Sequence, residues 1–417
     1  MSEKKEILQS TSEAVSEATV LDDFYPTEID KELAVRKKIL FVTRPLSPPW
    51  DEASKNFAYN LAINVAQINP ELEIHLLTKS DLREYNPALP KNIRQHPIYT
   101  VAENDITFSQ KLRSLFFQWK AKNKFDIVQY FFTPSKLNTW LIKRFLLPRQ
   151  SKTIQTIPTL REDLLTDKEI KKNMFADLLV TYSAYSRNKL KDLGFSNVQH
   201  IYPGIDLEKF SPRKKSANLL RKSGLKKNDF VMMFAGEYSR LGGLRDVLEA
   251  FARLEKKISS LRLFLALRIK NEKDARRKEI VKNELQNRGL LTKVVFEDEL
   301  DYEVVDMSEL FNLQDLMIYP IHNMNGKFDV PLVIPESMAC QKAVILSDLP
   351  LLREFANYDN AVIIKSGDRN ELIKIVEDLY DNPAERERLA SNARRFAQKK
   401  FDIKLVAEEY NDIYQRL

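Results

Sequence analysis

The sequence predicts an α/β protein with two doubly wound parallel sheets, and three observations support this fold class. Short continuous apolar runs alternate with stretches of helical spacing, as buried parallel strands and their connecting helices do. A basic polar stretch, residues 211–229, separates two such series. The chain has 417 residues, which is enough for two or three domains with sizeable cores.

The chain opens on an acidic segment that is rich in Ser, Thr and Glu up to about Asp30. This composition predicts a disordered leader over residues 1–36, which we expect to be dispensable for the fold. Its first residues lack the apolar core of a signal peptide. Cys340 is the only cysteine, so no internal disulfide can form and a cytoplasmic location is expected.

The first series of strands and helices predicts an N-terminal domain over residues 37–210. The apolar run at 38–44 is its first strand, and the helical spacing at 56–67 predicts the first helix. Further strands are predicted at 73–79, 126–132, 152–157 and 178–183.

The second series predicts a C-terminal domain over residues 211–400, followed by a helix over 401–417. The helix shows apolar spacing at Leu405, Val406, Tyr410, Ile413 and Tyr414. The strands of this domain are predicted at 230–236, 261–268, 293–298, 316–321, 342–347 and 360–365. Two α/β halves suit a periplasmic binding protein or a dehydrogenase equally well, so the motifs must decide the function.

The most informative motif is DVPLVIPESMACQKAVILSD, residues 329–348. Glu336 stands at the mouth of a short helix beside a strand, where a carboxylate can accept hydrogen bonds from paired sugar hydroxyls. The alternative is a helix-start carboxylate favoured only by the macrodipole. The motif resembles the donor site of the retaining GT-B glycosyltransferases of family 4, the glycosyl transferases group 1. The resemblance assigns Glu336 to the donor ribose and Pro331, Leu332 and Ser337 to donor binding.

The segment YPGIDLEKFSP, residues 202–212, resembles the hinge that ends the first domain in this family. Gly204 is expected to permit a turn with positive φ, and Asp206 to cap the turn that follows. Upstream, residues 181–195 resemble a family helix for which Ser183 is a suitable N-cap. The family fold has two Rossmann-like domains facing a cleft, and its C-terminal helix crosses back to the first domain.

The segment FAGEYSRLGGLRDVLEAF, residues 234–251, departs from the family pattern. The family has an arginine and a lysine that clamp the diphosphate where this chain has Glu237 and Gly242. We expect Arg240 to replace them, with support from Arg268 and Lys270, because a forked guanidinium suits a phosphate.

Two further places bear on the site. Many relatives carry a glutamate eight residues before the ribose-binding one, where this chain has Phe328, so Asp329 is the nearest candidate. The predicted catalytic residues are therefore Arg240, Asp329 and Glu336, although Asp329 suits a plain turn equally well. The loop at residues 48–62 corresponds to one that lies over the donor phosphates in relatives, and the resemblance indicates that Trp50, Asp51 and Lys55 belong to an acceptor-side loop in which Lys55 could supply charge. A solvated loop of the first domain explains these residues equally well.

Residues 109–124 place Leu112, Leu115, Phe116 and Trp119 on one helical face among basic residues. We expect an ordinary domain helix with this apolar face in the core. The alternative is a helix that lies in a membrane interface.

The resemblance implies a cytoplasmic enzyme that moves a hexose from a nucleoside-diphosphate sugar to a glycan, lipid-linked saccharide or small-molecule acceptor, with retention. No cofactor and no metal are expected, since basic side chains would stabilise the leaving diphosphate, and the four histidines show no metal-ligand spacing. The net charge of +7 suits an anionic partner. The expected partners are the donor and acceptor, with peripheral contact at the inner membrane face as an alternative and no nucleic acid.

A non-catalytic GT-B protein that binds a sugar nucleotide, or serves as a subunit, is the alternative function that Glu237, Gly242 and Phe328 suggest. A GT-B epimerase or phosphorylase is a further alternative.

Overall fold

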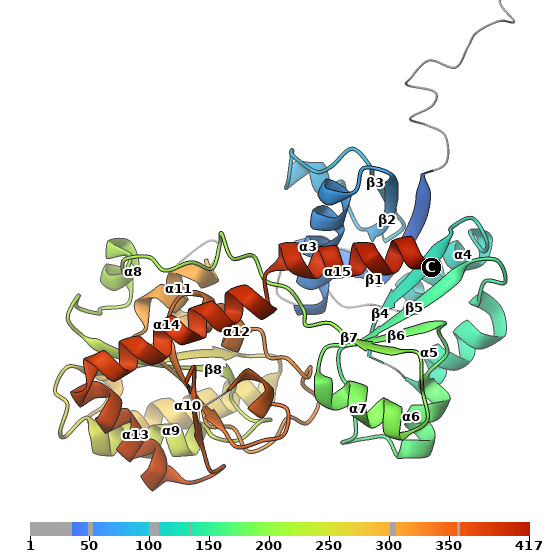
Figure 1. The fold of residues 1–417 in the computed structure, drawn as a ribbon. Helices are drawn as coiled ribbons and strands as arrows, with labels where there is room; N and C mark the ends of the chain where they lie inside the picture. The colour runs from blue at the N-terminus through green and yellow to red at the C-terminus, as the bar shows by residue number, and fades with distance from the viewer. Residues whose placement is uncertain (1–35, 49–52, 100–107, 134, 301–305, 357–358) are drawn as a thin grey trace, which may run out of the picture. The chain divides into compact units, whose positions relative to one another are not determined.

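Two parallel sheets organise the chain (Figure 1). The computed structural model describes residues 36–48, 53–99, 108–133, 135–300, 306–356 and 359–417. Residues 38–417 form one compact unit. The predicted leader lies outside the described residues, apart from its last position. None of the helices in the described ranges combines the length and apolar character needed to cross a bilayer.

The first sheet has seven strands in the order β3-β2-β1-β4-β5-β6-β7. Every pair of neighbouring strands that the register records is parallel, for example Ile39 beside Ile127. Its strands are β1 (Lys37–Leu46), β2 (Leu72–Thr78), β3 (Ile93–Pro97), β4 (Ile127–Phe131), β5 (Lys152–Ile157), β6 (Leu178–Thr181) and β7 (Val198–His200). The helices are α3 (Ala53–Ile68), α4 (Phe108–Lys120), α5 (Lys136–Leu141), α6 (Asp167–Asn173) and α7 (Ala184–Asp192), with short turns η1 (Leu82–Glu84) and η2 (Ile142–Leu146).

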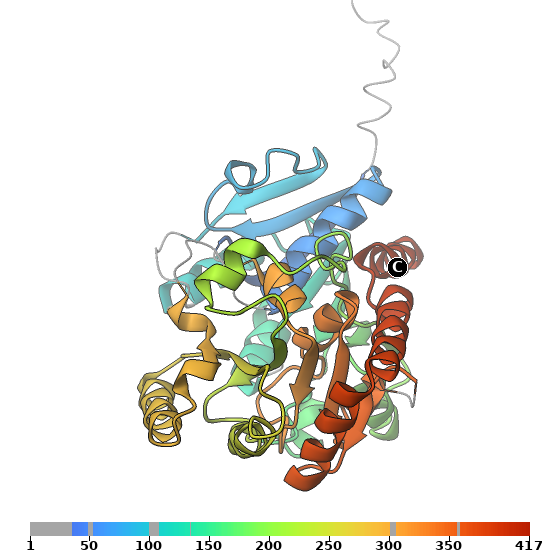
Figure 2. The ribbon, with the colours of Figure 1, turned by 90° about the vertical axis from the view of Figure 1, so that its left-hand side faces the viewer.

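The second sheet has six strands in the order β10-β9-β8-β11-β12-β13, with helices on either side of it (Figure 2). Its strands are β8 (Phe230–Glu237), β9 (Leu261–Arg268), β10 (Val294–Phe296), β11 (Leu316–Tyr319), β12 (Ala343–Ser347) and β13 (Val362–Ile364). The helices are α8 (Ala217–Lys222), α9 (Leu244–Leu254), α10 (Glu272–Asn287), α11 (Met307–Leu313), α12 (Val333–Ala339), α13 (Arg369–Asp381), α14 (Pro383–Lys400) and α15 (Ile403–Arg416), with turns η3 (Leu291–Lys293), η4 (Glu297–Glu299) and η5 (Arg353–Phe355).

The predicted fold class is confirmed, and every predicted strand is present. The sequence missed β3 and β7, the two edge strands of the first sheet. Both are short and only partly buried. They therefore lack the continuous apolar run that marks a central parallel strand.

The C-terminal helix α15 packs on the first domain, as the resemblance implied. The Phe57 and Tyr410 rings lie 6.2 Å apart between centroids, and the Asn69 amide donates to Asn411 over 2.7 Å. Tyr414 donates a hydrogen bond to the buried Gln129. One member of the predicted apolar face, Leu405, is exposed.

Gly204 is required for a reason other than the predicted one. Its φ is not positive. A Cβ there would lie 2.6 Å from Ile403 Cδ1 and 2.7 Å from Ile403 Cα. The close approach arises because Ile205 bonds to the start of α15: its N–H donates to Phe401 over 2.7 Å, and the Ile403 N–H donates back over 3.0 Å. The predicted caps are confirmed at Asp206 and Ser183, whose side chains accept N–H groups at 2.9–3.0 Å.

We expect Gly243→Ala to lower the free energy of unfolding by about 3 kcal/mol. Gly243 has a φ of 82°, and an added Cβ would lie 2.3 Å from the Pro320 carbonyl oxygen. Gly194→Ala is the matched control, because its φ is also positive, 95°, but nothing lies within 4 Å. The control should lose only about 1 kcal/mol. Denaturant unfolding of both variants measures the difference, and equal losses would show that the Pro320 contact relaxes freely.

Candidate functional site

The carboxyl edge of the second sheet brings together most of the predicted donor-binding residues. Strand β8 ends at Glu237 and β9 at Arg268, and these two residues are partners in the register. The loop from β11 to α12 leaves the same edge, and Glu336 stands in the first turn of α12. Ligands of open α/β sheets bind at this edge.

Glu336 is a half-buried carboxylate for which the described part of the chain supplies no hydrogen-bond partner. Burial raises its pKa to about 7, although the charges of Lys209 and Arg268 favour the ionised form. Arg268 is exposed and forms no ion pair with any described residue. A carboxylate held in this way can accept hydrogen bonds from a ligand's hydroxyl groups.

Glu237 is the centre of a cluster of cations. Arg240 donates two hydrogen bonds to its carboxylate, over 2.6 and 2.7 Å, and Lys270 donates one over 2.8 Å. Lys327 Nζ lies 3.5 Å from the same carboxylate. Burial would raise the pKa of Glu237, but the bonds from Arg240 and Lys270 and the charge of Lys327 lower it to about 2. Three cations around one carboxylate leave this place positively charged.

Lys327 is a member of this cluster that the sequence reasoning missed. Burial lowers the pKa of its ammonium to about 8, against the opposing charge of Glu237. Its side chain keeps 25% of its surface exposed, so a ligand can reach it. The sequence feature that could have pointed to Lys327 is its place in an Asn-Gly-Lys turn in the β11–α12 loop.

Gly242 stands where the family has a lysine, and its surroundings explain the glycine. Its φ is 76°, and an added Cβ would lie 2.7 Å from His322 Nδ1. That histidine is held by Asp246, 2.5 Å from Nε2. A lysine therefore has no space here unless His322 moves.

Asp329, a predicted catalytic residue, is engaged in a contact between the two domains. Its carboxylate is 2% exposed and accepts hydrogen bonds from Ser183 over 2.6 Å and Ser186 over 2.5 Å, at the start of α7 in the first domain. Burial raises its pKa to about 6 against these hydroxyl bonds. Glu354 supports the same contact by accepting the Tyr185 N–H over 2.6 Å.

The remaining predicted residues differ in their exposure. Ser337 is completely buried, and its Oγ accepts a hydrogen bond from Gln314 over 2.7 Å. Its hydroxyl is thus engaged within the protein, and its predicted donor role stays a prediction. Leu332, the residue before α12, is half-buried, whereas Pro331 is buried. Lys55, in the first turn of α3, is 5% exposed. Trp50 and Asp51 lie outside the described residues.

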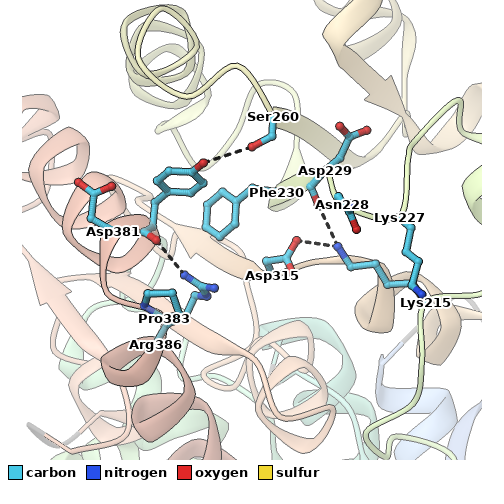
Figure 3. A pocket seen from close by; sticks show the side chains of 11 residues that line it. Lys215, Lys227, Asn228, Asp229, Phe230, Ser260, Asp315, Asp381, Pro383 and Arg386 are labelled. Atoms are coloured by element: carbon cyan, nitrogen blue, oxygen red, sulfur yellow. Dashed lines mark hydrogen bonds and ion pairs between the residues drawn. The ribbon is translucent and has the colours of Figure 1, made fainter.

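The opposite, amino edge of the second sheet carries a separate hollow (Figure 3). Lys215 crosses it and donates to Asp315 over 2.7 Å and to the Asp229 carbonyl over 3.1 Å. Arg386 donates to the carbonyl of Leu379. Lys215 and Arg386 thus form hydrogen bonds within the protein. Across the described ranges, no three His, Cys, Asp or Glu side chains come together as a metal site requires.

Comparison with known proteins finds similarity to glycosyltransferases. Residues 215–396 match the family model described as glycosyl transferases group 1. An uncharacterized glycosyltransferase of Methanocaldococcus jannaschii is 23% identical over 256 residues, which are 60% of this chain and 62% of that protein. The chain thus matches about three fifths of that relative's length.

Two solved structures share the fold. HepE of Anabaena, in complex with UDP-glucose, superposes with a TM-score of 0.69 at 17% identity, covering 91% of this chain and 100% of that one. Sucrose-phosphate synthase of Thermosynechococcus elongatus gives 0.69 at 16% identity, covering 91% and 99%. At these identities the likeness establishes the two-domain GT-B fold.

Proposed function

Because residues 215–396 match the model of the glycosyl transferases group 1 family, we propose that the chain is a retaining glycosyltransferase. It would move a hexose from a nucleoside-diphosphate sugar to an acceptor hydroxyl of a glycan, a lipid-linked saccharide or a small molecule. The observation that carries the proposal is the Glu336 carboxylate, which is half-buried and lacks a hydrogen-bond partner among the described residues. A ribose diol offers two hydroxyl donors for such a group.

The cations at the carboxyl edge supply the second requirement of the reaction. When the sugar leaves, negative charge grows on the diphosphate, and fixed cations stabilise the transition state. Arg240, Lys270 and Lys327 are held together by Glu237, and Arg268 ends the adjacent strand. We propose that these side chains bind the diphosphate and that the reaction needs no metal ion. The acceptor would attack on the face that the diphosphate leaves, without a protein nucleophile.

The complex of HepE with UDP-glucose supports a uridine nucleotide as the first donor to test. The experiment is to measure release of free nucleoside diphosphate from UDP-, GDP-, ADP- and dTDP-sugars, with lipid-linked and soluble acceptors. We expect release from one donor class to depend on an acceptor. The absence of release with every pair, together with tight donor binding, would contradict catalysis.

A non-catalytic sugar-nucleotide binder is the second candidate, and Glu237 and Gly242 favour it. A carboxylate stands where relatives have an arginine, and the relatives' lysine would require His322 to move. This candidate predicts donor binding without turnover. The release experiment therefore separates the two functions.

We expect donor affinity to be greatest between about pH 7 and pH 8. The ionised form of Glu336 binds the ribose, and its raised pKa of about 7 means that protonation weakens binding below that pH, by up to about tenfold per unit. Lys327 has a lowered pKa of about 8 and loses its positive charge above that pH. Calorimetric titration with UDP-glucose between pH 5.5 and 9 measures both the fall in affinity at acid pH (the acid limb of the profile) and the fall at alkaline pH (the alkaline limb).

Two variants assign the limbs of this profile. Glu336→Gln should remove the acid limb, and Lys327→Met should remove the alkaline limb. Each variant should leave the other limb in place, because the two groups titrate on opposite sides of the maximum. An acid limb that survives in Glu336→Gln would mean that another group controls it.

A further inference from the structure

Helix α4 presents its apolar face to solvent, which corrects the expectation that this face lies in the core. Phe116 is 61% exposed and Trp119 60% exposed, and Phe108 and Leu112 are exposed as well. Phe117 and Gln118, on its other side, attach α4 to the first domain, and Leu115, at the margin of the apolar face, is half-buried. The rings of Phe116 and Trp119 lie 6.1 Å apart between centroids.

The neighbouring segment α5–η2 continues this exposed apolar surface. Trp140 is 57% exposed, and its ring lies 5.7 Å from that of the exposed Phe145. The two segments are joined, because Lys122, just after α4, donates to the Phe145 carbonyl over 3.3 Å. Beneath them Ala121, Ile142 and Leu146 belong to one buried cluster. We call the exposed residues the aromatic surface; it consists of Phe108, Leu112, Phe116, Trp119, Leu137, Trp140 and Phe145.

Basic residues predominate in the segment that carries the aromatic surface, although Lys136 beside Leu137 pairs with Glu169 of α6. From Phe108 to Gln150 the only acidic residue is Asp126, whose carboxylate accepts the Lys38 N–H over 2.7 Å. The exposed basic residues of α4 and η2 are Lys111, Arg113, Lys120, Lys143 and Arg144. Among the described residues, no carboxylate pairs with any of these five. Arg144 instead lies 5.5 Å from the centre of the Phe145 ring.

We propose that the aromatic surface docks on an anionic lipid bilayer. Tryptophan prefers the level of the lipid headgroups, where its ring is apolar and its N–H stays wet. An amphipathic helix with Lys and Arg beside aromatic residues lies in this interface and is attracted by anionic lipids. The two exposed tryptophans and the unpaired cations meet both requirements. The attachment is peripheral and independent of the function proposed above.

The test is co-sedimentation of the full-length protein with vesicles of phosphatidylcholine, with and without 30% phosphatidylglycerol. We expect binding to the anionic vesicles to be at least tenfold tighter and to weaken with added salt. The variant Phe116→Ser/Trp119→Ser/Trp140→Ser should lose at least tenfold of this affinity. Its control, Tyr85→Ser/Leu164→Ser/Ile280→Ser, removes exposed apolar residues elsewhere and should bind as the wild type does.

A second pair of variants tests the charge. Arg113→Gln/Lys120→Gln/Arg144→Gln should abolish the preference for phosphatidylglycerol, whereas Lys214→Gln/Lys226→Gln/Lys227→Gln, exposed on the second domain, should retain it. Unchanged melting temperatures in all four variants would show that they fold. The proposal is overturned if the wild type does not bind anionic vesicles more tightly than neutral ones, or if the aromatic variant binds them with wild-type affinity. The proposal would also be overturned if light scattering showed that the wild type is a dimer and the aromatic variant a monomer, since a second copy would then cover the surface.

Discussion

Glu336→Ala is expected to weaken sugar-nucleotide binding by about 30- to 150-fold. The carboxylate has no hydrogen-bond partner among the described residues. The variant therefore loses the bonds to the ribose, but it loses no side-chain hydrogen bond within the described part of the protein. A pair of charge-assisted bonds contributes about 2–3 kcal/mol, which corresponds to that range. Calorimetric titration with the preferred donor measures the loss.

Two controls make this result specific. Glu336→Gln keeps the shape and one acceptor oxygen and should lose less affinity than the alanine variant. Glu284→Ala, on the remote helix α10, should bind as the wild type does. Removal of a half-buried charge should leave the melting temperature of Glu336→Ala unchanged or raise it, because burial of this carboxylate is itself unfavourable. Wild-type affinity in the folded variant would place the ribose elsewhere.

Arg240→Ala is expected to lower kcat by about 100-fold with a smaller effect on KM. Arg240 holds Glu237 through two hydrogen bonds, and its Nη1 donates to the Gly326 carbonyl over 2.7 Å. These bonds preorganise its charge beside the predicted diphosphate. The charge on the leaving group grows in the transition state, so the loss of about 2.7 kcal/mol appears mainly in kcat.

Arg276→Ala is the matched control, because Arg276 also pairs with a glutamate, Glu272, but stands exposed on α10. It should keep the wild-type rate. Arg240→Lys should recover part of the loss, since an ammonium restores the charge without the planar fork. If Arg240→Ala and Arg276→Ala gave the same kcat as the wild type, the cluster around Glu237 would not be the diphosphate site.

The fold was predictable because buried parallel strands carry their own signal. Strands β5 and β9 begin and end at the residues predicted for them. The hinge prediction was partly right: Asp206 caps its turn, but Gly204 is needed for the approach of Ile403. That contact joins residues almost two hundred positions apart, and no local pattern reports it.

The site was less predictable because its contacts also join residues that are far apart in the sequence. Asp329 meets Ser183 and Ser186 across more than 140 positions, so its use in a contact with α7 could not be inferred from its turn. The position of Lys327 beside Glu237 depends on two loops at the carboxyl edge. Helix α4 shows a further limit: spacing reveals that one face is apolar, but not whether protein covers that face.

The most direct test of the account is a structure of the protein with UDP-glucose bound. The account predicts that the ribose hydroxyls lie within about 3 Å of the Glu336 carboxylate and that the diphosphate lies beside Arg240 and Lys327. A nucleotide bound instead at the amino edge of the second sheet, in the hollow beside Lys215 and Arg386, would contradict it.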